Sequence, residues 1–141
     1  MYPGRVMALD VGGSRIGVAL SDPSRTLASP YITLHAKPRE RVLQHIAQLI
    51  KKEEVVELVL GLPLTLSGEI GPQAKTIHEF ADALRPLIAV PLHFFDERLT
   101  TVAANRMMSD LGLKPEQRKA RIDEVAASII LQDFLDSQRN H

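Results

Sequence analysis

The chain opens with two short apolar runs separated by glycines. Residues Arg5 to Asp10 (RVMALD) and Ile16 to Asp22 (IGVALSD) are largely apolar, and Gly12 and Gly13 stand between them. Paired glycines between apolar runs favour a tight turn with positive φ, because glycine has no Cβ to clash there. We therefore expect two strands joined as a β-hairpin.

Three further segments also predict strands. Ala28 to His35 indicates a third strand beside the hairpin, and Pro30 favours the sheet edge because proline cannot donate a ladder hydrogen bond. Val55 to Gly61 (VVELVLG) is a β-branched apolar run, typical of a strand covered on both faces. Val90 to Phe95 is another short buried strand.

Apolar residues at helical spacing indicate the remaining elements. Four helices are expected, over about residues 38–52, 73–87, 100–111 and 122–136. Leu62 to Pro72 is rich in Gly, Pro, Ser and Thr and predicts a loop, while Leu113 to Arg121 indicates a polar, basic connection. Three early strands followed by alternating helices and strands predict an α/β fold: one domain over residues 1–141, with a mixed five-stranded sheet flanked by helices.

Composition narrows the function classes. The chain has 141 residues, of which 45% are hydrophobic, so it can bury a core. It has no cysteine, which excludes disulfides and thiolate metal sites. Neither a signal-peptide pattern nor an apolar run long enough to span a bilayer is present, so we expect a cytoplasmic protein without membrane partners. Lys plus Arg and Asp plus Glu both number 17, so any nucleic-acid binding must come from local patches.

Several carboxylates stand at the ends of apolar elements. Asp10 ends the first predicted strand, and Asp96 and Glu97 follow the last one. Charges beside a core are costly unless they are compensated, which makes these positions candidates for a site. The structural alternatives are a turn residue at Asp10 and an acidic helix start at Asp96 and Glu97. Adjacent strand residues face opposite sides of a sheet, so the pattern leaves open which of these two points toward Asp10.

Asp123 begins the last predicted helix in an unusual position. By helical spacing it aligns with four apolar residues, Ala126, Ala127, Ile130 and Phe134. A carboxylate at the head of a buried stripe should approach the core beside the sheet, although helix capping is the alternative. Oxygen ligands without Cys or a His cluster favour Mg²⁺ or Mn²⁺ over zinc. The five histidines show no metal-ligand spacing, and His93 is expected in the core.

Four sequence blocks in order carry a family resemblance. ALDVGGSRIGVALSD, LVLGLPLTLSGEIG, DERLTT and IDEVAASIILQDFL together closely resemble the YqgF (RuvX) family of ribonuclease H-like nucleases, over nearly the whole chain from Val6 to about Leu135. The resemblance implies three acidic metal ligands, which fall on Asp10, Glu97 and Asp123 and thus select Glu97 over Asp96. It also implies two Mg²⁺ or Mn²⁺ ions, bridged by Asp10, that drive phosphodiester hydrolysis to a 5′-phosphate and a 3′-hydroxyl.

Two substrates follow from the resemblance. One is the 5′ end of the 16S ribosomal RNA precursor, with pre-ribosomal particles as partners, and the other is the Holliday junction in branched DNA. Resolving a four-way junction calls for two active sites and hence a symmetric dimer, although the sequence does not reveal the oligomeric state.

Basic residues near the predicted site are candidates for contacts with substrate phosphates. They are Arg15, Arg98, Lys114, Arg118, Lys119 and Arg121. Four loop residues are expected near the site: Gly12, Gly13, Gly61 and Pro63. The alternative for the basic 113–121 segment is an ordinary solvated connection.

Two other classes compete with a nuclease. A nucleotide-binding protein of the actin and sugar-kinase type also carries a D-x-G loop, as at Asp10 to Gly12, but needs a second lobe that 141 residues cannot supply. A non-catalytic nucleic-acid-binding module would keep the fold without cleavage. The presence of Asp10, Glu97 and Asp123 together argues against that module.

Overall fold

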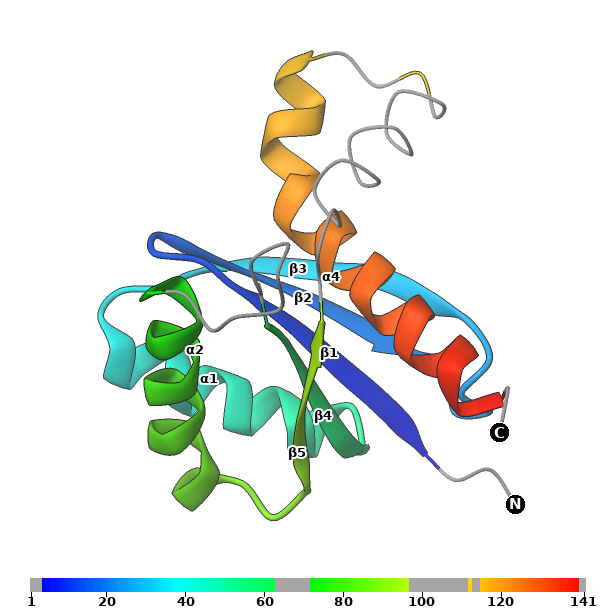
Figure 1. Ribbon diagram of the computed structural model, residues 1–141, viewed down its shortest axis with the longest axis horizontal. Coiled ribbons are helices and arrows are strands. Elements are labelled where there is room, and N and C mark those ends of the chain that lie inside the picture. Colours follow the sequence, from blue (N-terminus) through cyan, green and yellow to red (C-terminus); the bar gives the residue numbers. More distant parts are fainter. Residues whose placement is uncertain (1–3, 63–71, 97–111, 113–114, 140–141) are drawn as a thin grey trace.

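The computed structural model describes residues 4–62, 72–96, 112 and 115–139 (Figure 1). The strands are β1 (Arg5–Val11), β2 (Arg15–Ser21), β3 (Ala28–His35), β4 (Val55–Leu62) and β5 (Leu92–Asp96). The helices are α1 (Arg39–Lys52), α2 (Pro72–Leu84), the 3₁₀ turn η1 (Arg85–Leu87) and α4 (Pro115–Arg139). Within the described ranges, no helix combines the length and hydropathy needed to cross a membrane.

The five strands form one mixed sheet in the order β3-β2-β1-β4-β5. β1 pairs antiparallel with β2, and β2 with β3, whereas β1–β4 and β4–β5 are parallel. The predicted mixed five-stranded sheet is confirmed. β1 lies at its centre, and the acidic residue near its end, Asp10, pairs with Gly17 of β2, one residue beyond the last β1 residue paired with β4.

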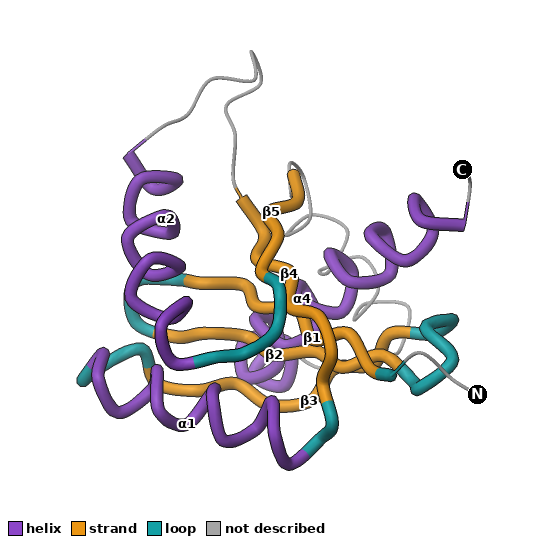
Figure 2. Tube along the Cα trace, turned by 90° about the horizontal axis from the view of Figure 1, so that it is seen from below, coloured by secondary structure: helices purple, strands orange, loops and turns teal. Residues whose placement is uncertain are grey.

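Side chains alternate between two differently covered faces of this sheet. Met7 and Leu9 pack in the larger core, which contains the buried residues of α1 and α2. Val6 and Ala8 pack on the other face, against Ile130 and the neighbouring buried residues of α4. Figures 1 and 2 show this arrangement, with α1 and α2 on one side of the sheet and α4 on the other. The α4 face is lined by small residues, which lets that helix approach the strands closely.

The β1–β2 hairpin forms as predicted, but its glycines act differently from the prediction. Neither Gly12 nor Gly13 has a positive φ. The Gly12 N–H donates to the Arg15 carbonyl at 2.9 Å, and a Cβ at Gly12 would stand 2.9 Å from that same oxygen. A Cβ at Gly13 would meet nothing within 4 Å. Only Gly12 requires glycine in this turn, because the Arg15 carbonyl approaches it too closely for a Cβ.

Strand β3 confirms the predicted edge position. The β2–β3 register shifts between Val18 and Ala19, where Val18 pairs with Ile32 but Ala19 pairs with Pro30. Tyr31 is thus the extra residue of a bulge, which lets Pro30 sit in the strand. Among the strands that the structure describes, none lies beyond β3, so β3 forms one edge of the sheet.

The basic segment before Asp123 was wrongly predicted as a loop. Residues from Pro115 onward are helical and continuous with α4, which runs to Arg139. Proline is well suited to the first helical position, and Glu, Gln, Arg, Lys and Ala all have good helix propensity. The segment has no apolar stripe of its own. It continues a helix whose later residues pack against the sheet. The predicted helix over residues 100–111 lies outside the described residues.

Candidate active site

Asp10 lies in the central strand, on the face covered by α4. It is the next-to-last residue of β1, and its side chain alternates with those of Val6 and Ala8, which pack in the α4 core. Its partner across the antiparallel ladder is Gly17. The carboxylate is partly exposed, so it is open to solvent at the margin of the core.

Asp123 is placed directly above the partner of Asp10. A Cβ built at Gly17 would stand 1.9 Å from the Asp123 carbonyl oxygen, so the α4 backbone rests on the bare Cα of Gly17. Residues directly opposite in an antiparallel pair have Cα atoms roughly 4.5–5.5 Å apart. Asp10 and Asp123 are therefore brought to one face and one level of the sheet, although they lie far apart in the sequence.

Gly17 is the functional residue that sequence reasoning missed. It stands in the middle of an apolar strand, where glycine weakens the strand and often marks close approach of another backbone. That signal was present in IGVALSD. Its meaning depends on which helix approaches, and the sequence alone did not show this.

Arg15 joins these two acidic positions. It begins β2 on the face of Gly17, and its Nε donates to Asp123 Oδ2 at 2.7 Å. The Arg15 side chain is 48% exposed and that of Asp123 is 22% exposed, so solvent screens the pair and its contribution to stability is small. The pair holds the Asp123 carboxylate toward the hairpin, and nearly half of the Arg15 side chain remains exposed to solvent.

Asp96 is separated from this site by the sheet. Its side chain alternates with Leu92 and Phe94, which pack against the α1 and α2 core, whereas Phe95 packs against the α4 core. Asp96 thus occupies the face opposite Asp10. The sequence pattern left open whether Asp96 or Glu97 points toward Asp10. The position of Asp96 excludes it from the site around Asp10.

The other predicted site residues divide into two groups. Those outside the described residues are Glu97, Arg98, Lys114 and Pro63. Those on the described backbone are Arg118, Lys119 and Arg121 in α4, Gly61 in β4 paired with Phe95, and Gly12 and Gly13 in the hairpin turn.

His93 corrects a further prediction. It was expected in the core, but its side chain is 48% exposed and its Nε2 lies 2.9 Å from Glu57 Oε2. Its ring also stacks on Phe134 with the centroids 6.5 Å apart. β5 is an edge strand, and among the described elements α4 packs less against β5 than against β1, β2 and β3, which leaves His93 exposed.

The donor chemistry of the site fits a hard divalent cation. Asp10 and Asp123 offer carboxylate oxygens, the ligand type that Mg²⁺ and Mn²⁺ prefer. Among the described residues, no three His, Cys, Asp or Glu side chains are grouped to hold a metal ion. Of the three expected carboxylates, Asp10 and Asp123 lie in the described part of the chain and share one face of the sheet. The Asp123 carboxylate is paired with Arg15.

Comparison with solved structures defines the fold class. The chain is similar to Thermus thermophilus RuvC in complex with a Holliday junction substrate, with a TM-score of 0.60 at 13% identity, covering 96% of each chain. It is also similar to the fowlpox virus resolvase in complex with Holliday junction DNA, with a TM-score of 0.57 at 9% identity, covering 95% of this chain and 98% of that one. The fold is that of the ribonuclease H-like proteins.

Sequence comparison defines the family. Residues 4–137 match the family described as "RuvX: Holliday junction resolvase", and the chain belongs to that family. A protein of Roseiflexus sp. (strain RS-1) named "Putative pre-16S rRNA nuclease" is 69% identical over 137 residues, covering 97% of both chains. A Moorella thermoacetica protein of the same name is 45% identical over 132 residues, covering 94% of each. The family description and these names both denote nucleases, which hydrolyse phosphodiester bonds.

Proposed function

We propose that this chain is a divalent-metal-dependent nuclease that acts in 5′-end maturation of the 16S ribosomal RNA precursor. The observation that carries the proposal is the seating of Asp123 on Gly17, opposite Asp10, because it brings two distant carboxylates to one solvent-open point. The names of the relatives support the RNA substrate. We assign Asp10, Glu97 and Asp123 as the metal-binding carboxylates.

Each described residue has a defined task in this proposal. Bound Mg²⁺ or Mn²⁺ would supply an activated water and stabilise the leaving oxygen. Asp10, fixed in the central strand, gives the site a rigid ligand. Arg15 holds the Asp123 carboxylate and presents its exposed guanidinium to a substrate phosphate. Asp123 would hold a metal ion in place of Arg15, and the Arg15 guanidinium would then be free to bind a substrate phosphate.

Branched DNA is the second candidate substrate, and the family description favours it. Cutting a four-way junction symmetrically needs two copies of the site, so this activity requires a dimer. Maturation of the precursor RNA needs a single cut, which one copy of the site can make. The state of association under assay conditions therefore helps to separate the two substrates.

The decisive experiment compares both substrates side by side. Purified protein is incubated with Mg²⁺ or Mn²⁺ and either a precursor 16S RNA fragment or a four-way junction, and the products are sized and tested for a 5′-phosphate. We expect Asp10→Asn to reduce cleavage by about 100-fold or more, because it removes a charged ligand. The folded structure should remain, since Asn has the same shape as Asp.

Asp96→Asn is the matched control, because it removes the same charge from the opposite face of the sheet. This variant should cleave as the wild type does. If wild type and Asp10→Asn both fail to cut either substrate, the chain is a non-catalytic nucleic-acid-binding module. Binding of ATP in calorimetry would instead support the actin-type alternative.

A further inference from the structure

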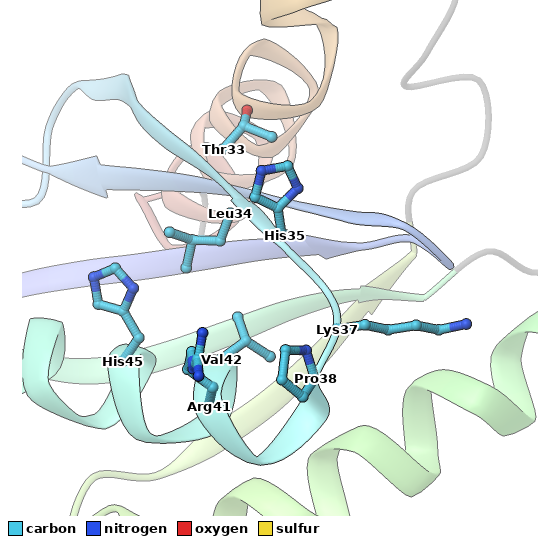
Figure 3. Close-up of a pocket in the computed structure, with 8 residues that line it drawn as sticks. All are labelled: Thr33, Leu34, His35, Lys37, Pro38, Arg41, Val42 and His45. Carbon is cyan, nitrogen blue, oxygen red and sulfur yellow. The ribbon is translucent and has the colours of Figure 1, made fainter.

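A cavity of about 300 Å³ lies at the open edge of the sheet, between the end of β3 and the first turns of α1 (Figure 3). Buried Leu34 and Val42 form its apolar base. Four side chains that carry or can accept a positive charge line its exposed rim: His35, Lys37, Arg41 and His45. None of the described residues that line this cavity carries a carboxylate.

The cationic lining is notable in a chain with no net charge. Arg41 and His45 are four residues apart on α1, so they share one side of that helix. Lys37 lies in the connection between β3 and α1. Neither Lys37 nor Arg41 forms an ion pair with any residue that the structure describes. Their charges are therefore available to a ligand.

The cavity adjoins the candidate active site at the β3 edge: its base, Leu34 and Val42, belongs to the α1 and α2 core, whereas His35 on its rim points to the α4 face. His35 is the direct ladder partner of Arg15, and the Ala36 N–H donates to the Ser14 carbonyl at 2.9 Å. Directly paired residues point to the same face of a sheet. Because Arg15 also contacts Asp123, side chains that carry or can accept a positive charge lead from Asp123 through Arg15 and His35 to the rim of the cavity.

We infer that the nucleic-acid backbone leaving the cleavage site crosses the β3 edge and that one of its phosphates is bound in this cavity by Lys37 and Arg41. The inference rests on the proposed function and extends it by naming a second contact surface. The described lining of the cavity contains no Phe, Tyr or Trp, so these residues offer no platform for base stacking. The contact reads the phosphate backbone and tolerates any base sequence.

The test measures binding separately from cleavage. All proteins carry Asp10→Asn, and fluorescence anisotropy follows their binding to a labelled four-way DNA junction and to a labelled precursor RNA fragment at several salt concentrations. The double variant Lys37→Ala/Arg41→Ala is compared with Lys51→Ala/Lys52→Ala. The control removes two exposed lysines from the far end of α1, so the net charge changes equally.

We expect Lys37→Ala/Arg41→Ala to weaken binding by about tenfold or more at 0.1 M salt, and to flatten the dependence of log affinity on log salt by about 2 on duplex DNA. The control pair should bind as the parent protein does. Shortening the substrate one base pair at a time from the end should weaken the parent at a defined length, and the double variant should lack that step.

Two outcomes overturn the inference in distinguishable ways. Equal loss of affinity in the two double variants, with the parent binding well, would mean that only net charge matters and would leave the proposed function intact. Failure of the parent to bind either nucleic acid would remove both the cavity contact and the proposed substrate. Weaker binding of RNA alone, or of DNA alone, assigns the contact to that nucleic acid. Thermal unfolding confirms that each variant is folded.

Discussion

Replacing Gly17 with alanine adds one methyl group at the point where α4 rests on the sheet. The new Cβ would stand 1.9 Å from the Asp123 carbonyl oxygen and 2.8 Å from the Glu124 backbone nitrogen. Both atoms belong to the helix backbone, so no side chain can rotate away to make room. To restore a normal contact, α4 must retreat by about 1 Å from β2 at this position.

The magnitude of the effect follows from that displacement. Overpacking of a well-packed contact costs about 1–3 kcal/mol, and a backbone clash belongs at the upper end. At this chain length such a loss lowers the Tm by roughly 5–10 °C. Because Asp123 moves with the helix, its carboxylate shifts away from Asp10, and a displacement of about 1 Å in a reacting group costs on the order of 100-fold in rate.

The assay pairs Gly17→Ala with Gly13→Ala. A Cβ at Gly13 meets nothing within 4 Å and its φ is not positive, so this variant should keep its Tm and its cleavage rate. Thermal unfolding followed by circular dichroism measures stability, and cleavage is measured well below both midpoints. If Gly17→Ala kept the wild-type Tm and rate, the contact of α4 with β2 would not be what places Asp123.

Two further predictions concern charged groups. Arg15→Ala should tighten Mn²⁺ binding to the protein without nucleic acid by up to about fivefold in calorimetry, because Asp123 loses a competing partner; an unchanged affinity would contradict that competition. Asp22 accepts hydrogen bonds from the Ser24 hydroxyl and from two backbone N–H groups of its turn, and these bonds lower its pKa from 3.8 to about 2. A lowered pKa stabilises the fold above pH 3.8 and loses that effect as the pH falls toward 2, so the Tm difference between wild type and Asp22→Asn should shrink over this range. A difference that stays constant would refute the assignment.

The elements with strong periodicity could be predicted from the sequence. The stripe of Ala126, Ala127, Ile130 and Phe134 is buried as helical spacing indicated, which places Asp123 at its head beside the sheet. The run from Leu58 to Gly61 is covered on both faces, because Leu58 and Leu60 pack in the α1 and α2 core and Val59 in the α4 core; earlier in the strand, Val56 is 40% exposed. In each case a local repeat of hydrophobicity was enough.

Features that depend on tertiary neighbours could not be predicted. The residues after Pro115 lack an apolar stripe, so their helical state follows from propensity and from continuity with a helix already packed on the sheet. The exposure of His93 depends on how far α4 extends over β5. The cationic cavity is lined by Lys37 from the β3–α1 connection and by Arg41 from α1, a combination that no spacing in the sequence indicates.

The contact between Gly17 and Asp123 also has a consequence for how the molecule acquires activity during synthesis. The hairpin is made early, but the helix that completes the acidic cluster follows all five strands in chain order. Contacts between residues this far apart in the sequence form late, because closing the long loop costs entropy before the contact can stabilise the fold. If Asp123 is a metal ligand as we propose, a nascent chain with its sheet formed would still be unable to cut nucleic acid until α4 has docked.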